Sequence, residues 1–347
     1  MHKQTVLVSK YLIYSIIFLF SLCLGSNSHS SEMTSQVCPL LHTFVEIKLW
    51  GPRAEKAMDA AFTEMARVND LLNNYDPKSE VSDINRKAGK AAVVISPETM
   101  DALRKAKDFC ELSRGALDFT IGPLIKLWGF AQDVPGLSGK EPDEETISAT
   151  KSLVDYRLLK LKNETKDGQV HRTAFLPKEG MYIDVGSFGK GYIADRAMDI
   201  LREHGIENAL IAAGGTICTM GKKPDGSLWN TAIRHPRNNK SFLTVLTFNN
   251  KSVSTSGDYE KFYKKKGKRR THIIDPRVGI PVASIQSSTV IAPDGMTSDC
   301  LSTSLFVLGA EEGIQLIDSL PNVEALIVSQ KGEIIFSKGW PVKEVEY

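Results

Sequence analysis

The sequence of 347 residues contains little cysteine and almost no net charge, and both features restrict what the protein can be. Its 5 cysteines include no Cys-x-x-Cys pair, which argues against a zinc site or a disulfide-rich fold. Lysine and arginine number 43 and aspartate and glutamate 41, so no basic excess indicates a nucleic-acid-binding protein. No repeat at a fixed spacing is visible, which argues against solenoids and propellers.

The one long apolar run lies at the N-terminus, and its length separates two interpretations. Two lysines precede it, the apolar residues extend over 11–24, and small polar residues follow. A membrane anchor needs about 20 apolar residues. The shorter run favours a cleaved export signal over residues 1–30. Residues 31–347 are then expected to form one exported domain, most simply in a bacterial periplasm, because no long linker divides them.

Four cysteines lie beyond this segment, and export would allow their oxidation. Their spacing is wide, and each lies in apolar or mixed sequence, where a buried thiol is the simpler expectation. One disulfide stays open as an alternative. The four are Cys38, Cys110, Cys218 and Cys300.

Helix and strand patterns alternate along the rest of the chain. Residues 43–50 alternate like a half-buried strand, whereas residues 54–72 repeat apolar side chains at helical spacing. Residues 131–150, rich in Gly, Pro and acidic side chains, predict a surface connection. Further helices are predicted over 99–111, 193–204, 298–308 and 310–320, and further strands over 158–161, 170–175, 181–183, 209–212, 229–233, 243–248, 252–255 and 288–291, with two more near the C-terminus. The expected fold class is α+β, with mixed sheets and packed helices in a single large domain.

Residues 184–192 (DVGSFGKGY) run from a strand through a glycine-rich turn into a helix. Backbone N–H groups at such a turn can hold phosphate, and Lys190 can add a positive charge. A tight turn with a solvated lysine is the alternative, and the glycine spacing is not that of a P-loop. The paired glycines 214 and 215 give a weaker signal of the same kind, which a β-bulge explains equally well.

Residues 297–306 (TSDCLSTSLF) predict a helix start that carries oxygen ligands. Asp299 and Thr303 are four residues apart and therefore share one face. Two hard oxygen donors suit Mg²⁺, because water and substrate phosphate can complete its octahedron. Helix capping with an incidental hydroxyl is the alternative.

Residues 255–279 contain a Thr-Ser-Gly-Asp-Tyr run and, after it, His272. A histidine titrates near working pH and suits a general base, although a buried structural histidine fits as well. Between them, residues 264–270 (KKKGKRR) predict the tip of a basic hairpin. A solvated loop is favoured there over nucleic-acid binding, because no aromatic platform for stacking bases accompanies it beyond Tyr263.

In this order, the segments resemble the ApbE family of flavin transferases. The resemblance extends from about Leu40 to Ile335 and includes a single-domain α+β fold. Its matching stretches are residues 71–85 (LLNNYDPKSEVSDIN), 115–130 (GALDFTIGPLIKLWGF), 184–195, 255–259, 272–279 and 289–309.

The resemblance implies a set of site residues. Its metal ligands correspond to the backbone carbonyl of Ser187 and the side chains of Asp299 and Thr303. His272 and Lys190 correspond to catalytic residues. The implied contacts with FAD are Tyr75, Asp118, Lys190, His272 and Ile273.

The resemblance also implies an activity, the Mg²⁺-dependent attachment of FMN from FAD to a Ser or Thr of an acceptor protein, with release of AMP. The implied acceptors are flavin-carrying subunits of membrane redox complexes, of the sodium-translocating NADH:quinone reductase or Rnf type. Two alternatives stay open. One is an FAD pyrophosphatase that forms FMN and AMP with water as the nucleophile, and the other is a non-catalytic periplasmic flavin carrier. Mn²⁺ suits the same oxygen ligands as Mg²⁺.

Overall fold

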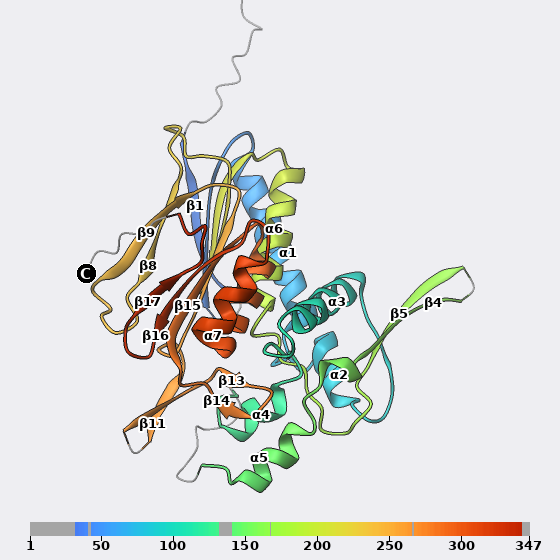
Figure 1. Ribbon diagram of the computed structural model, residues 1–347. Coiled ribbons are helices and arrows are strands. Elements are labelled where there is room, and N and C mark those ends of the chain that lie inside the picture. Colours follow the sequence, from blue (N-terminus) through green and yellow to red (C-terminus); the bar gives the residue numbers. More distant parts are fainter. Residues whose placement is uncertain (1–31, 41–42, 132–140, 167, 266, 342–347) are drawn as a thin grey trace, which may run out of the picture.

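The computed structural model describes residues 32–40, 43–131, 141–166, 168–265 and 267–341 (Figure 1). The expected export signal, residues 1–30, lies outside the described residues.

An eight-stranded antiparallel sheet forms the centre of the molecule. Its strand order mixes distant parts of the chain, so residues far apart in sequence meet at its ends. In spatial order the strands are β1 (Thr34–Leu40), β2 (Thr43–Trp50), β6 (Asn208–Ala213), β7 (Thr216–Met220), β10 (Ser252–Gly257), β15 (Ile285–Ala292), β16 (Glu324–Ser329) and β17 (Ile334–Phe336).

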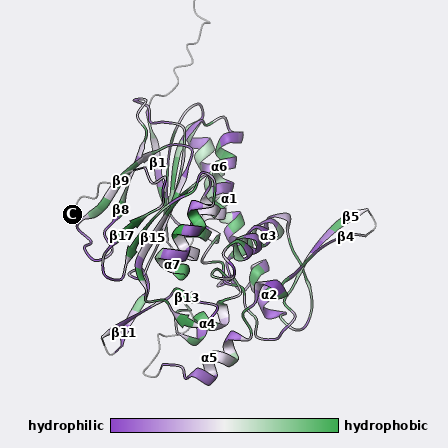
Figure 2. Cartoon of the chain, viewed as in Figure 1, coloured by the Kyte–Doolittle hydropathy of each residue, from purple (hydrophilic) through white to green (hydrophobic). Residues whose placement is uncertain are grey.

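Three long helices, α1 (Ala54–Leu72), α6 (Gly189–Glu203) and α7 (Gly295–Asp318), lie along one face of this sheet (Figure 1). The hairpin of β8 (Trp229–Arg234) and β9 (Phe242–Phe248) covers part of the other face. Side chains of β10 alternate between the two faces of the sheet. Val253 packs beneath the β8–β9 hairpin, while its neighbours Ser252 and Ser254 contact α7 on the other face. Figure 2 shows apolar residues concentrated in these central strands and in α7.

Smaller elements surround the lower end of the sheet in Figure 1. Two hairpins project from the body on opposite sides, β4–β5 and β11–β12. The smaller elements are α2 (Glu80–Arg86), β3 (Val93–Val94), α3 (Pro97–Leu112), α4 (Gly122–Leu127), α5 (Glu144–Lys151), η1 (Tyr156–Leu158), β4 (Lys160–Lys166), β5 (Gln169–Phe175), β11 (Phe262–Lys265), β12 (Lys268–Thr271), β13 (Ile274–Asp275) and β14 (Ile280–Pro281).

The α+β prediction is confirmed, and the helix predicted over 54–72 has the same bounds as α1. Residues 132–140 of the surface connection predicted over 131–150 lie outside the described residues. The prediction is wrong from Glu144 onward, because α5 begins there. Asp143 caps that helix by accepting from the Thr146 N–H, and two glutamates in its first turn complement the helix dipole. The acidic run is thus a helix start.

Other elements also differ from the prediction. The strand predicted over 158–161 begins only at Lys160, after the 3₁₀ helix η1. Residues 181–183 form no strand, and Tyr182 makes a single bridge to Ile121 instead. The helices predicted over 298–308 and 310–320 are one element, α7, broken at Gly309, whose φ of 78° lies in the left-handed region that glycine tolerates.

The described cysteines agree with the expectation of buried thiols. Cys110, Cys218 and Cys300 are buried, Cys38 is half-buried, and all four carry free thiols. By length and composition, one helix among the described residues, α7, could cross a membrane. More than half of its most apolar window is buried inside the protein, as expected of a core helix.

Candidate active site

A cleft of about 400 Å³ opens where the N-terminus of α6 and the first turns of α7 meet the ends of β7 and β10. It collects residues from almost the whole length of the chain. All eight site residues inferred from the sequence line it: Tyr75, Asp118, Ser187, Lys190, His272, Ile273, Asp299 and Thr303.

The carboxylate of Asp299 is buried and held by the backbone of α6. Gly191 donates its N–H to Asp299 Oδ2 at 3.0 Å. In a regular helix this N–H would bond the carbonyl four residues earlier, which belongs to Ser187. Because the bond is diverted, no donor among the described residues lies within hydrogen-bond distance of the Ser187 carbonyl. The turn therefore offers an unused carbonyl oxygen beside a carboxylate.

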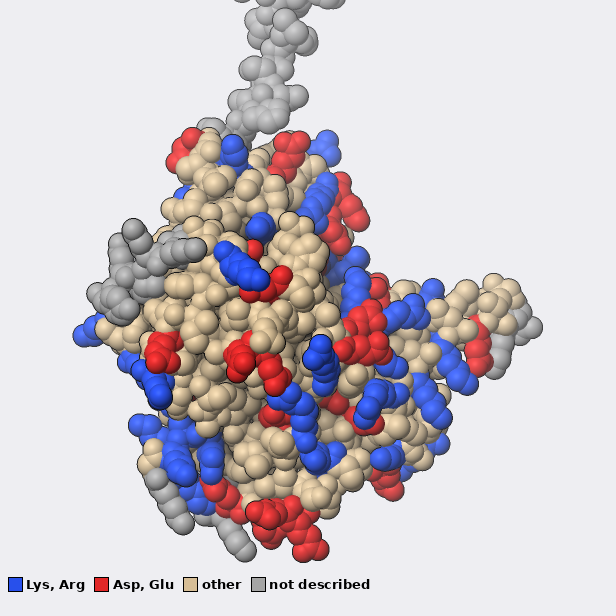
Figure 3. Space-filling view, in the orientation of Figure 1, with Lys and Arg blue, Asp and Glu red and all other residues tan. Residues whose placement is uncertain are grey.

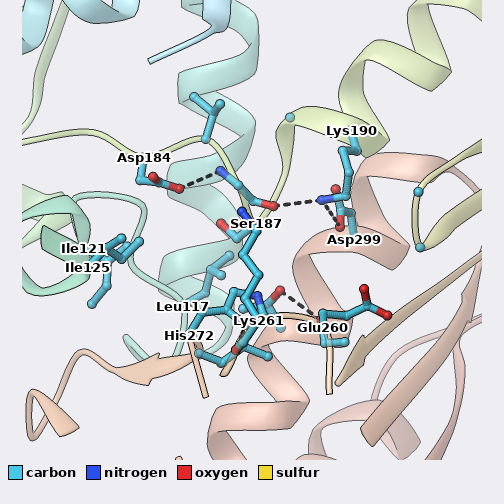
Figure 4. Close-up of a pocket in the computed structure, with 18 of the residues that line it drawn as sticks. Leu117, Ile121, Ile125, Asp184, Ser187, Lys190, Glu260, Lys261, His272 and Asp299 are labelled. Atoms are coloured by element: carbon cyan, nitrogen blue, oxygen red, sulfur yellow. Dashed lines mark hydrogen bonds and ion pairs between the residues drawn. The ribbon is translucent and has the colours of Figure 1, made fainter. Parts of the chain in front are cut away.

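Lys190 places its ammonium between the Gly186 carbonyl and the Asp299 carboxylate (Figure 4). Its Nζ donates to the Gly186 carbonyl at 2.9 Å and lies 3.5 Å from Asp299 Oδ1. The oxygens of the turn before α6 and of Asp299 on α7 thus already attract one positive charge, the Lys190 ammonium. The hard oxygens of Ser187, Asp299 and Thr303 match the preference of Mg²⁺, so the residues present fit that ion. The described residues hold no cluster of three His, Cys, Asp or Glu, and this donor set needs none.

A seam of buried hydroxyls fixes α7 against β10 and so positions Thr303. Ser298 Oγ lies 2.8 Å from both Ser252 Oγ and Ser254 Oγ. One turn later, Ser256 Oγ lies 2.9 Å from Ser302 Oγ and 3.3 Å from Thr303 Oγ1. Sequence reasoning missed this seam, although hydroxyl residues at alternate strand positions and at i, i+4 in the helix signal it.

His272 is held in one tautomer by the backbone of Lys261. The Lys261 carbonyl accepts both the His272 backbone N–H at 3.0 Å and the ring Nδ1 at 3.1 Å. Since a carbonyl can only accept, Nδ1 carries the hydrogen and Nε2 keeps its lone pair. Desolvation, with smaller contributions from the charges of Lys261 and Lys190, lowers the pKa of His272 to about 4. The ring is therefore a neutral proton acceptor at pH 7.

Lys261 itself is a residue that sequence reasoning missed. Its side chain is exposed and lines the cleft, and Figure 4 shows it extending from beside His272 toward the turn at Ser187. No carboxylate among the described residues lies within 4.0 Å of its ammonium, whereas the neighbouring Glu260 pairs with Arg234 at 2.7 Å. A lysine two residues after Tyr259, at the base of the basic hairpin, was the available signal. It gives the cleft a second cation.

Asp184 organises the turn that precedes α6. It accepts hydrogen bonds from the Gly186 N–H at 2.8 Å, from Asn74 Nδ2 at 3.3 Å and from the Tyr75 hydroxyl at 3.3 Å. Burial, together with the nearby Asp184 charge, raises the pKa of Tyr75. Tyr75 thus lines the cleft as a neutral phenol that connects residues 73–75 to the glycine-rich turn.

Asp118 lines the cleft, but its oxygens already have partners within the protein. Oδ1 accepts from the backbone N–H and the hydroxyl of Thr120, and Oδ2 accepts from the Tyr156 N–H. Burial raises the pKa of Asp118, and these hydrogen bonds oppose that shift. The carboxylate joins the wall of the cleft to residues 155–156, which is a positioning role.

The end of the cleft away from Lys190 is apolar (Figure 4). Phe130 stacks on Tyr263 with a centroid distance of 5.4 Å and meets His272 edge-on at 6.4 Å. The aliphatic side chains that line this end are Leu117, Ile121 and Ile125. A cleft with cations at one end and flat, apolar surfaces at the other suits a ligand that combines phosphates with aromatic rings.

Comparisons with known proteins agree with this geometry. The ApbE family model matches residues 41–327. A FAD:protein FMN transferase of Klebsiella pneumoniae (strain 342) is 34% identical over 82% of this chain and 85% of its own length. One of Treponema pallidum (strain Nichols) is 31% identical over 83% of this chain and 82% of its own length.

Solved structures give the same result. The crystal structure of an ApbE protein from Thermotoga maritima superposes with a TM-score of 0.79 at 29% identity, covering 89% of this chain and 98% of its own. The flavinyl transferase ApbE of Pseudomonas stutzeri in its apo form gives 0.77 at 26% identity, covering 88% and 94%.

Proposed function

Because this chain belongs to the ApbE family, we propose that it is a FAD:protein FMN transferase, which attaches FMN from FAD to an acceptor protein. One observation of the site supports this most directly. A general base with a free lone pair, His272, lines the same cleft as two cations and a set of hard oxygen ligands.

The reaction we propose transfers the FMN phosphoryl group to a Ser or Thr hydroxyl of the acceptor. The hydroxyl oxygen bonds to the FMN phosphorus, and the bond from that phosphorus to the oxygen of the AMP phosphate breaks. The hydroxyl proton goes to His272 Nε2, the atom that the Nδ1 hydrogen bond leaves unprotonated. FMN remains joined to the acceptor by a phosphoester, and AMP leaves.

The diphosphate of FAD needs positive charge, which this chain supplies from two sides. Lys190 and Lys261 line the cleft and would stabilise the negative charge of the phosphoryl oxygens. Asp299, Thr303 and the Ser187 carbonyl would hold Mg²⁺, which when bound neutralises charge on the diphosphate. Tyr75, Ile273 and the ring of Phe130 would orient the rings of the substrate.

The acceptors we propose are flavin-carrying subunits of membrane redox complexes, of the sodium-translocating NADH:quinone reductase or Rnf type. We further propose that the protein is exported to a bacterial periplasm, since residues 1–30 have the pattern of an export signal. A periplasmic enzyme would meet acceptor domains on the outer face of the cytoplasmic membrane.

The test is mass spectrometry of such an acceptor domain after incubation with the protein, FAD and Mg²⁺, with released AMP measured in parallel. We expect an FMN-sized gain on one Ser or Thr only when metal is present. His272→Ala should abolish the gain while FAD still binds. AMP and free FMN without labelling would identify a pyrophosphatase, and FAD binding without either product would identify a carrier.

A further inference from the structure

The β11–β12 hairpin carries positive charge that the reaction proposed above does not use. No acidic residue occurs between Lys261 and Ile274, and the two strands form a small sheet of their own, with Tyr263 opposite Arg270 and Lys264 opposite Arg269. Figure 3 shows Lys and Arg side chains gathered at the lower left of the molecule, over this hairpin. The hairpin projects from the body, as Figure 1 shows.

Two of its arginines are used to hold the hairpin in place. Arg269 contacts the buried Asp258 at 3.5 Å, and Arg270 pairs with Glu141 at 2.7 Å. On the inner side, Tyr263 stacks on Phe130 of the cleft. These contacts fix the base of the hairpin relative to the site.

Two exposed lysines of the hairpin have no such partner among the described residues; the register places Lys264 on the face of Phe262 and Lys268 on the face of Tyr263. Lys264 and Lys268 are exposed, and no carboxylate among the described residues lies within 4.0 Å of either ammonium. Phe262 is 40% exposed, and the Arg269 guanidinium lies over its ring at 3.9 Å. Aromatic residues and arginine are enriched at protein interfaces relative to the rest of the surface.

The hairpin is continuous with the site. Lys261 precedes β11 and His272 follows β12, and both line the cleft. An acceptor must bring its hydroxyl to His272 Nε2, and His272 directly follows β12, so the acceptor surface around that hydroxyl comes close to the hairpin. A partner that docks there meets unpaired ammonium groups, and acidic side chains complement them.

We propose that three exposed residues of the β11–β12 hairpin, Phe262, Lys264 and Lys268, form the docking surface for the acceptor protein, and that they contact acidic side chains beside the modified hydroxyl. This inference rests on the proposed transferase function. The hairpin would guide the acceptor and contribute little to the binding of FAD.

The test uses the full-length protein and, as acceptor, the flavin-carrying domain of a sodium-translocating NADH:quinone reductase subunit. In the double variant Lys264→Glu/Lys268→Glu, we expect the KM for acceptor to rise at least about tenfold. The KM for FAD and FAD binding by fluorescence quenching should stay within about twofold of wild type. The wild-type KM for acceptor should also rise with salt, and this dependence should weaken in the variant.

A matched control reverses two lysines on the other projecting hairpin. Lys160→Glu/Lys162→Glu changes the net charge by the same amount, and both residues are exposed on β4, on the opposite side of the molecule. We expect this variant to behave like wild type. An equal rise in KM would mean that overall charge matters rather than docking, and would overturn the inference.

A second arm changes the acceptor. Replacing its Asp and Glu residues near the modified hydroxyl by Asn and Gln should raise KM with the wild-type protein and have little further effect with the charge-reversed hairpin, because the same contacts would be removed twice. Independent, additive effects would overturn the inference. Labelling of no acceptor by wild-type protein would instead overturn the transferase proposal itself.

Phe262→Ser supplies a variant without a change of charge. We expect it to raise the KM for acceptor at every salt concentration and to leave FAD binding unchanged. A loss of FAD affinity in any of these variants would place the hairpin in the FAD site and contradict its assignment to the acceptor.

Discussion

The backbone N–H of Gly191 donates to the Asp299 carboxylate at 3.0 Å and thereby joins α6 to α7 at the most polar point of the cleft. The contact requires a very close approach of the two helices. A Cβ atom at Gly191 would overlap the backbone of Gly295 and Met296. Glycine at this position therefore sets where Asp299 lies.

Gly191→Ala should separate the helices and displace Asp299. We expect a loss of about 1–3 kcal/mol in the free energy of unfolding, the usual cost of overpacking, together with weaker metal binding. Thermal unfolding and the electron paramagnetic resonance of bound Mn²⁺ measure the two effects. Gly189→Ala, whose Cβ would meet only the Val185 side chain at 3.3 Å, is the control on the same helix. Equal metal affinity in both variants would contradict this role for Gly191.

Asp299→Asn tests the metal site while keeping an oxygen that can accept from Gly191. We expect metal-dependent AMP release to fall at least about a hundredfold, because the one anionic ligand is lost. The melting temperature should change little. Thr303→Val should act in the same direction, and Thr303→Ser, which keeps the hydroxyl, should retain most of the activity. Full activity of Asp299→Asn would remove the metal assignment.

The His272 ring should be neutral at pH 7 with its hydrogen on Nδ1. Nitrogen-15 NMR of the 7 histidines, with His272→Gln to assign the signal, measures both the tautomer and the pKa. We expect a pKa of about 4, well below the usual 6.5. Because the unfolded ring takes up a proton near 6.5 and the folded ring near 4, stability should fall as pH falls through this range. A pKa near 6.5 would contradict the desolvation of the ring, and a hydrogen on Nε2 would contradict the hydrogen bond from Nδ1 to the Lys261 carbonyl.

Lys261→Gln removes a charge and keeps the backbone carbonyl that orients His272. The pKa of His272 should rise, because the Lys261 charge lowers it, and FAD affinity should fall about tenfold through the lost charge-assisted contact with phosphate. NMR titration and fluorescence quenching by FAD measure these two changes. Lys251→Gln, directly before the start of β10, removes the same charge from a residue that does not line the cleft, and should alter neither. An unchanged His272 pKa in Lys261→Gln would place this ammonium away from the ring.

Asp195 anchors the start of α7, since it accepts from the N–H groups of Gly295 and Met296 at 2.6 and 2.8 Å. Burial raises its pKa to about 7. The unfolded carboxyl releases its proton near 4, so between pH 4 and 7 the folded state binds more protons and stability falls as pH rises. Asp195→Asn should remove about 1 kcal/mol or more of this dependence, seen by urea unfolding at pH 4.5 and 7.5. A wild-type pH dependence that persists in Asp195→Asn would assign it to another group.

Much of the local structure followed from the sequence because it depends on neighbouring residues. The apolar periodicity of residues 54–72 defined α1, and the i, i+4 spacing of Asp299 and Thr303 placed both side chains on one helical face. Errors occurred where a tertiary contact replaced a local preference. Residues 181–183 look like a strand, yet Tyr182 is held by a single bridge to Ile121.

The sequence by itself indicated Lys190, Asp299 and Thr303 as candidate site residues, because residue types and spacing are local properties, and the family resemblance added the other candidates. Only the tertiary structure decided which hydrogen bonds those groups make. Within the described part of the chain, the Ser187 carbonyl accepts no hydrogen bond because Gly191 donates to a carboxylate 108 residues away. His272 keeps its Nε2 lone pair because the Lys261 carbonyl accepts from Nδ1. Each non-proline residue has one backbone N–H donor and one carbonyl acceptor, so their hydrogen-bond partners depend on which distant segments pack against them.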